Sequence, residues 1–323
     1  MELRRLFSRR LVVLAMAGAL AVTGLLLLGV RQSAQPMSDE ARAQAQAEYE
    51  RARADWEENG EEIEAQCRAD EELERESTGQ DVDFGCESLE PQPEWFLVSA
   101  PELQDSLPGT VGAAATLLVF LAFLVGATFT AAEVSTGSLS TWLTFEPRRL
   151  RVYVAKLLAA ALGVLPAAAV VLVVTVAGAW AVTDRYGLAD GMTTRHWSGT
   201  GTMVLRILAL TALFALVGAA LGFLLRHTAA VLGVVVGYVI VVELMLMNYL
   251  GELQPWLVVK NVEGWINRGA SYFVDVCTTG PTGTTCEFTE RSLAFGHSAV
   301  YLVTLTAVVV LAGALVLRRR DAV

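Results

Sequence analysis

The sequence contains few of the residues that most catalytic and metal sites require. Among 323 residues there are three His and four Cys, and the Cys spacing matches no zinc-binding pattern. The histidines, His196, His227 and His297, fall at the ends of apolar segments and far apart in sequence. No G-x-x-x-x-G-K-S/T phosphate loop occurs, so the chain cannot hydrolyse ATP by that route. We therefore expect no catalytic residue, no metal and no cofactor in this chain.

Charged residues are also scarce, at 18%, whereas 54% of residues are hydrophobic and the mean hydropathy is +0.48. About 20 consecutive apolar residues span a bilayer as a helix, and lipid satisfies no backbone hydrogen bonds. The sequence therefore predicts an all-α polytopic membrane protein with six transmembrane helices. The six apolar runs cover residues 11–30, 108–131, 152–182, 201–225, 229–250 and 298–317. The first is longer than the apolar core of a signal peptide, so we expect it to be retained.

Half of the 24 Lys and Arg lie in segments that six spans place on one side of the membrane. They are Arg4, Arg5, Arg9, Arg10, Arg148, Arg149, Arg151, Lys156, Arg226, Arg318, Arg319 and Arg320. The positive-inside rule makes this side cytoplasmic, which places both termini in the cytoplasm. No other basic face exists, so we predict contact with the lipid bilayer and no nucleic-acid partner.

The first extracellular loop, residues 32–107, is long and acidic. Residues 38–94 hold 20 Asp and Glu against 5 Arg, a local balance of −15, although the whole chain carries only −10. Helix-forming residues after Ser38 predict an acidic helical insertion between spans 1 and 2, broken near Asn59-Gly60 and at Thr78-Gly79. It either caps the membrane domain or contacts a substrate or partner.

The last extracellular loop, residues 251–297, contains apolar stretches too short to span a bilayer. They lie at residues 256–259, 265–266 and 272–274, and two begin with Trp. Trp is typical of the headgroup level, so we predict short re-entrant or interfacial helices between spans 5 and 6.

All four cysteines fall in the two long extracellular loops, where disulfides are stable. Three pairings are possible. Cys67 with Cys86 and Cys277 with Cys286 are the simplest, since each pair lies within one loop.

Two charges fall inside predicted spans. Arg206 lies near the outer end of the fourth span, and Glu243 lies about 22 Å along the fifth at helical rise. Unpaired charges at such depth are costly, so we expect the two to form an ion pair or to line a cavity. Glycines four apart, Gly218 with Gly222 and Gly233 with Gly237, favour close helix packing.

The segment of residues 133–149, between spans 2 and 3, has the pattern of an amphipathic interfacial helix. It begins with Glu133, and Gly137 permits a sharp turn. Leu139, Trp142 and Leu143 then share one helical face, Pro147 ends the helix, and Arg148 and Arg149 anchor it at the headgroups.

The pattern Glu133-x-x-x-Gly137-x-Leu139, followed by Pro147-Arg148-Arg149 and by Lys156 at the next span, resembles the permease subunits of bacterial ABC-2 type exporters. Their six spans with both ends inside agree with this chain, and so does material between spans 5 and 6. The resemblance implies that residues 133–149 are a coupling helix seated in a separate cytoplasmic ATPase, which holds the Mg-ATP. It also implies a second permease copy, identical or different, and a place in the bacterial cytoplasmic membrane. The long acidic first loop departs from the family.

These expectations divide the chain into five parts. They are residues 1–31 (the N-terminus and span 1), 32–107 (the acidic extracellular domain), 108–250 (spans 2 to 5 with the coupling helix), 251–297 (the last extracellular loop) and 298–323 (span 6 and a basic tail). The predicted function is the membrane subunit of an ATP-driven exporter. The alternative is a membrane-anchored sensor or docking protein that acts through its acidic extracellular domain.

Overall fold

The computed structural model describes residues 10–79, 82–97, 99–138, 148–245, 251–280 and 283–319. The chain forms two compact units. Unit 1 comprises Met1–Gln32, Glu102–Tyr272 and Ser292–Val323, and unit 2 comprises Ser33–Pro101 and Phe273–Arg291.

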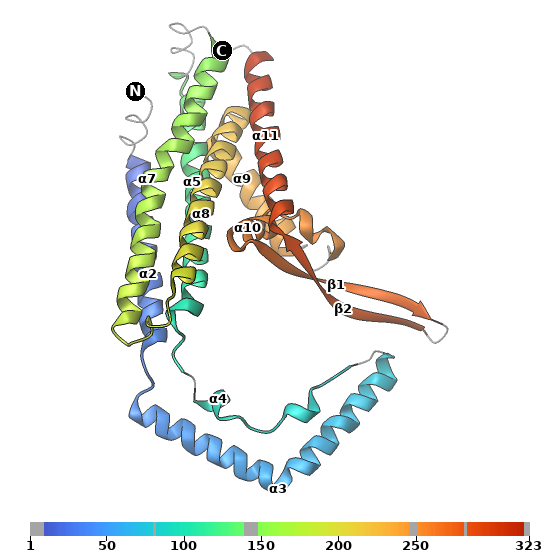
Figure 1. Ribbon diagram of the computed structural model, residues 1–323. Coiled ribbons are helices and arrows are strands. Elements are labelled where there is room, and N and C mark those ends of the chain that lie inside the picture. The colour runs from blue at the N-terminus through green and yellow to red at the C-terminus, as the bar shows by residue number, and fades with distance from the viewer. Residues whose placement is uncertain are drawn as a thin grey trace. The chain divides into compact units, whose positions relative to one another are not determined.

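Unit 1 is a bundle of long apolar helices (Figure 1). Within the described residues, six helices are long and apolar enough to cross a membrane, which confirms the predicted polytopic helical fold. They are α2 (Arg10–Ala34), α5 (Leu103–Ser135), α7 (Arg149–Asp184), α8 (Thr194–Leu225), α9 (Thr228–Tyr238) continued by the π-helix η2 (Val239–Met245), and α11 (Phe295–Arg319).

Helix α8 contacts α5, α7, α9, α10 (Val258–Asn267) and α11, and its closest neighbour is α5. Gly218 and Gly222 face α5 so closely that an added Cβ would overlap the Phe123 carbonyl oxygen or the Thr130 hydroxyl. Thr130 in turn donates a hydrogen bond of 2.8 Å to the Ala219 carbonyl of α8. The predicted close packing at the first glycine pair is therefore present. A Cβ on Gly233 or Gly237 of α9 would meet nothing within 4 Å.

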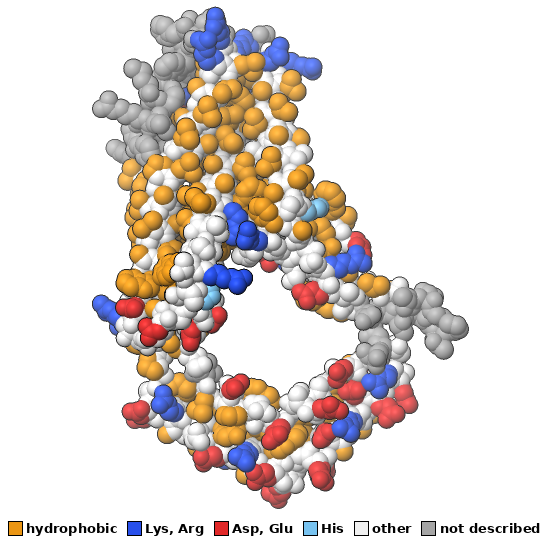
Figure 2. All heavy atoms as spheres, viewed as in Figure 1, with side chains coloured by type: hydrophobic (Ala, Val, Ile, Leu, Met, Phe, Trp, Pro, Cys, Tyr) orange, Lys and Arg blue, Asp and Glu red, His pale blue; other side chains and the backbone are white. Residues whose placement is uncertain are grey.

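The beginnings of α2 and α7 and the ends of α5 and α11 lie at the same end of unit 1 (Figure 1). We call this the basic end, because Lys and Arg side chains gather there, whereas hydrophobic side chains cover the helices (Figure 2). This clustering is the pattern from which the sequence predicted that both termini lie on one side.

Unit 2 contains α3 (Asp39–Thr78), η1 (Cys86–Ser88) and α4 (Pro93–Phe96). The Ser38 hydroxyl accepts a hydrogen bond from the Ala41 amide, and Gly79 ends the helix at φ 67°, as predicted. The predicted break near Asn59-Gly60 is wrong, because α3 runs through both residues.

Two contacts explain why α3 continues through that dipeptide. The Asn59 amide donates to the Asp55 carboxylate one turn earlier at 2.8 Å, and the Trp56 ring packs on Gly60. Both side chains therefore support helical geometry at residues that usually interrupt it. The helix bends along its length but does not break (Figure 1).

The segment between η2 and α11 differs in part from the prediction of short helices. The 3-10 helix η4 (Gly251–Trp256) and α10 are short helices, but β1 (Gly269–Gly280) and β2 (Gly283–Ala294) form a two-stranded sheet. Residues 272–274, predicted as helix, lie in β1. They belong to a run in which exposed Phe273 and Asp275 alternate with buried Val274, a period of two that favours a strand.

Candidate functional site

A buried ion pair joins the two helices that flank the predicted coupling segment. Lys156, early in α7, pairs through Nζ with the Glu133 carboxylate near the end of α5. The Lys156 side chain is 2% exposed and its ammonium lies 5.1 Å from the centre of the Phe129 ring, within cation–π range. Glu133 is itself only 8% exposed. The resemblance implied that Glu133 belongs to the segment that contacts the ATPase, and in the structure its carboxylate also joins α5 to α7.

A second contact at the basic end joins α7 to α11. The Tyr153 hydroxyl donates to the Val310 carbonyl at 2.7 Å, and the Tyr153 ring packs on the Phe223 ring of α8 with centroids 4.9 Å apart. Gly313 of α11 provides the room, because a Cβ there would lie against the Tyr153 side chain. Through Lys156 and Tyr153, the first two turns of α7 contact three other spans.

The predicted coupling residues lie between these anchored helix ends. Gly137 has φ 71°, the left-handed conformation that the predicted sharp turn requires, and the Ser138 hydroxyl donates to the Glu133 carbonyl. Arg148 is the N-cap of α7 and Arg149 is its first residue. Leu139, Trp142, Leu143 and Pro147 lie outside the described residues.

Unit 1 also contains a partly open cavity of about 1000 Å³, which we call the chamber. Its walls come from α5, α8, α9, η2, α10 and α11 and are mostly apolar. The polar side chains that line it include Tyr238, Glu243, Glu263 and Tyr301. A large apolar cavity with a few convergent polar groups is typical of a ligand-binding site.

Glu243 lies at the chamber wall and is 2% exposed. Its Oε1 accepts hydrogen bonds from the Tyr238 hydroxyl and the Val258 amide, both at 2.7 Å, and the Val259 amide lies 3.3 Å from each carboxylate oxygen. The two amides are the first N–H groups of α10, so the carboxylate caps that helix at the positive end of its dipole. Glu243 belongs to the π-helix, a local deviation frequently found at functional sites.

Arg206 does not pair with Glu243. Within the described residues no ion pair joins them, and Arg206 does not line the chamber. The structure therefore places Glu243, but not Arg206, at the wall of the chamber. No sequence pattern predicted that Glu243 accepts hydrogen bonds from the α10 amides. Residue spacing does not determine how the chain runs from η2 to the start of α10.

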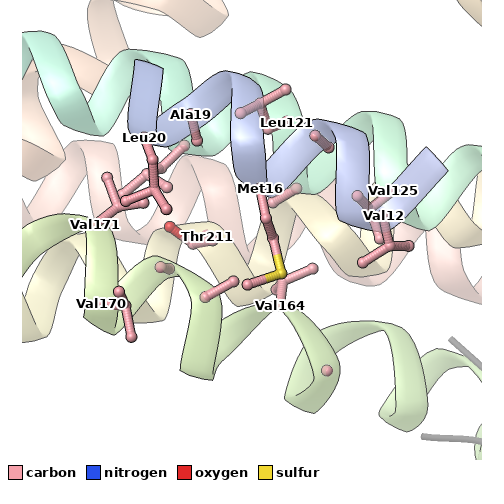
Figure 3. Close-up of a pocket in the computed structure, with 16 residues that line it drawn as sticks. Val12, Met16, Ala19, Leu20, Leu121, Val125, Val164, Val170, Val171 and Thr211 are labelled. Carbon is pink, nitrogen blue, oxygen red and sulfur yellow. The ribbon is translucent and has the colours of Figure 1, made fainter. Parts of the chain in front are cut away.

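A second, apolar pocket of about 50 Å³ lies between α2, α5, α7 and α8 (Figure 3). The Met16 side chain of α2 extends toward Val164 of α7, and Val, Leu, Ala and Gly residues make up the rest of the lining apart from Thr211. Thr211 is the one polar residue of this lining, and its hydroxyl is bonded to the Ile207 carbonyl at 2.7 Å. The pocket is a packing gap without a group that could orient a ligand.

The predicted disulfide between Cys67 and Cys86 is present and ties α3 to η1. Cys277 is also disulfide-bonded. Cys286 lies in β2, and its side chain is outside the part of the chain that the structure describes.

The six apolar helices define a multi-pass membrane protein. A family model described as ABC-2 family transporter protein matches residues 5–322, nearly the whole chain, so the chain belongs to the ABC-2 transporter family. It is therefore a permease component of an ABC transporter, a type of membrane subunit that is typically non-catalytic and works with an ABC ATPase. No curated protein and no solved structure matches the chain.

Proposed function

We propose that this chain forms the substrate path of an ATP-driven exporter in a bacterial cytoplasmic membrane. In this proposal the basic end faces the cytoplasm, and a separate ATPase that holds Mg-ATP grips residues 133–149. The observation that carries the proposal is that buried contacts fix both helix ends that flank this segment. The Glu133–Lys156 pair fixes the end of α5 to the start of α7, and Tyr153 fixes α7 to α11.

Rigid anchoring matters because a motor can move only what resists deformation. If the coupling segment were attached to flexible helix ends, ATPase movement would bend those ends and leave the spans in place. The buried ion pair, with the Phe129 ring beside it, lets a push on the segment displace α5 and α7 together. Movement of α5 reshapes the chamber, because α5 supplies one of its walls.

The size and lining of the chamber favour a substrate with a substantial apolar part. Its volume of about 1000 Å³ lies at the upper end of the range typical of small-molecule sites, and its lining is mostly hydrophobic. Glu243 places a carboxylate at the wall, although its oxygens already accept hydrogen bonds from Tyr238 and α10. We propose that this chamber, completed by a second permease copy, holds the substrate during export.

The test is co-purification followed by ATPase measurement. Tagged chain expressed with a candidate ABC ATPase should retain that ATPase, and reconstitution of the two should raise ATP turnover. Replacing Trp142 and Leu143 by Ala should release the ATPase. The matched control is Trp180→Ala, an exposed Trp of α7 far along the helix from its start, which should leave retention unchanged. Equal retention by the loop variant and the control would exclude residues 133–149 as the coupling contact.

The alternative of a sensor or docking protein has one observation in its favour, because the acidic Asp39–Thr78 helix belongs to a compact unit of its own. Replacing residues 39–96 by a short Gly-Ser linker distinguishes the two functions. An exporter should keep its ATPase and its stimulated ATP turnover, whereas a sensor should lose its response while its spans remain intact.

A further inference from the structure

Arg206 carries a guanidinium group inside a membrane-spanning helix. Its Nε and Nη1 atoms are buried and make no hydrogen bond to any residue that the structure describes. Its backbone carbonyl accepts a hydrogen bond of 2.8 Å from the indole N–H of Trp265, so α8 and the last turn of α10 are in direct contact at this residue. Buried guanidinium nitrogens are normally paired, because desolvation without a partner costs several kcal/mol.

A second arginine lies beside the first. Arg268 follows Trp265 by three residues, one helical turn, and is the C-cap of α10. The Trp265 hydrogen bond therefore brings the C-terminal end of α10, which carries Arg268, against α8 at Arg206. Within the described residues neither side chain makes an ion pair or a hydrogen bond. Nearby carboxylates of α10 and η2 are engaged elsewhere, since Glu263 pairs with Lys260 at 3.0 Å and Glu243 caps α10.

A buried guanidinium without a partner, next to the end of a helix that carries a second arginine, favours the binding of an anion. Guanidinium groups match phosphate oxygens in pairs and bind them by charge-assisted hydrogen bonds. Basic pockets between membrane helices recognise lipid headgroups in this way. We propose that Arg206 and Arg268 together bind the phosphate of a membrane phospholipid where α8 meets the end of α10.

The surroundings favour a lipid as the source of this phosphate. Leu205, beside Arg206, is 67% exposed, as expected of a side chain that faces acyl chains. Arg206 follows a polar first stretch of α8, Thr194–Thr202, and precedes the long apolar run, which places it near the boundary of the hydrocarbon core. Trp265 has the amphipathic side chain that is typical of the headgroup level. The proposal does not depend on the transport function.

Native mass spectrometry of the purified full chain tests the proposal. The probes are phosphatidylglycerol and a galactosyl diacylglycerol with the same acyl chains, which lacks phosphate. The wild-type chain should retain phosphatidylglycerol and release the glycolipid. Each arginine substitution should weaken retention about tenfold, the loss expected when charge-assisted hydrogen bonds are removed. Arg195→Gln, which removes an exposed arginine in the first turn of α8, is the control and should retain phosphatidylglycerol fully.

Arg268→Gly tests the role of the guanidinium with a substitution that should not impair folding. Arg268 has φ 66°, a conformation that suits glycine, so this change removes the guanidinium without straining the backbone. It should lower phosphatidylglycerol retention while the melting temperature holds or rises, and Arg268→Lys should restore part of the retention. Full retention by Arg206→Gln with Arg268→Gly, or equal retention of both lipids by the wild type, would overturn the proposal. Displacement of the lipid by millimolar inorganic phosphate would overturn the lipid as the occupant and assign the site to free phosphate.

Discussion

At the scale of single residues, the Glu133–Lys156 pair joins two opposite charges in the interior of unit 1. Both side chains are nearly inaccessible, so neither charge is solvated by water if its partner is removed. Breaking a buried pair from one side is strongly destabilising, whereas replacing both charges by neutral groups often is not. A stabilising pair therefore differs from two charges that are close by chance in the stability lost on single replacement and recovered on double replacement.

Lys156→Met should therefore lower the free energy of unfolding by about 3 kcal/mol, because it leaves the Glu133 carboxylate buried without its cation. The double variant Glu133→Gln, Lys156→Met should recover most of that loss. Thermal unfolding in detergent micelles measures both. The control is Arg53→Met in unit 2, whose partner Glu57 is 66% exposed and whose loss should cost no more than about 0.5 kcal/mol. An unchanged melting temperature for Lys156→Met would mean that the pair does not stabilise the bundle.

Sequence reasoning singled out Glu133 and Lys156 but did not predict that the two residues pair. Glu133 and Lys156 stood out because one ends a span and the other begins the next. Their pairing depends on the distance between two helix ends, which sequence spacing does not provide. For Arg206 and Glu243 the sequence suggested a pair that the structure does not form. Their similar depth in two spans was compatible with an ion pair, but Glu243 accepts hydrogen bonds from Tyr238 and from α10.

At the scale of elements, the glycines of α8 fix how closely it approaches α5. Gly218→Ala should lower stability by about 1–3 kcal/mol, because its Cβ would overlap the Phe123 carbonyl and force the two backbones apart. Gly24→Ala on α2 is the matched control, since a Cβ there meets nothing within 4 Å. Both variants are compared by thermal unfolding in the same detergent. Equal melting temperatures would show that the α5–α8 interface tolerates separation.

The hydrogen bonds between Glu243 and the first amides of α10 provide a second prediction at this scale. Glu243→Ala removes the acceptor of the Val258 and Val259 amides, so hydrogen exchange across residues 257–262 should accelerate. Glu243→Gln keeps an acceptor oxygen and should retain much of the protection, which separates hydrogen bonding from charge. If the Ala variant exchanges as slowly as the wild type, packing alone holds α10.

Among the elements, the long helices were the easiest to predict and the connecting segments the hardest. Apolar runs of about 20 residues have one structural solution in lipid, so all six spans could be located from composition. The segment after α10 is short, mixed and rich in Thr, and its apolar residues suit either a helix or a strand. Local rules also failed at Asn59-Gly60, where Asp55 and Trp56 one turn earlier support the helix.

At the scale of the whole molecule, α9 and η2 are, among the membrane segments that the structure describes, the one least covered by other described residues. Only 11% of its apolar window is buried, compared with 50% for α8. Val234, Ile240 and Leu244 are exposed, and Gly233 and Gly237 have open space in front of them. Glycines four residues apart let two membrane helices approach closely, so we expect this segment to face the second permease copy.

Gly237→Leu should therefore disrupt the dimer, because a large side chain would separate the two helices at their closest approach. Subunit counting by single-molecule photobleaching in native membranes measures this directly. The wild type should bleach in two steps and the Gly237 variant in one, while Gly24→Leu on α2, another glycine with open space around it, should still bleach in two. One-step bleaching of the wild type together with a different co-purifying permease would assign a heterodimer. Two-step bleaching by the Gly237 variant would exclude this face of α9 as the dimer contact.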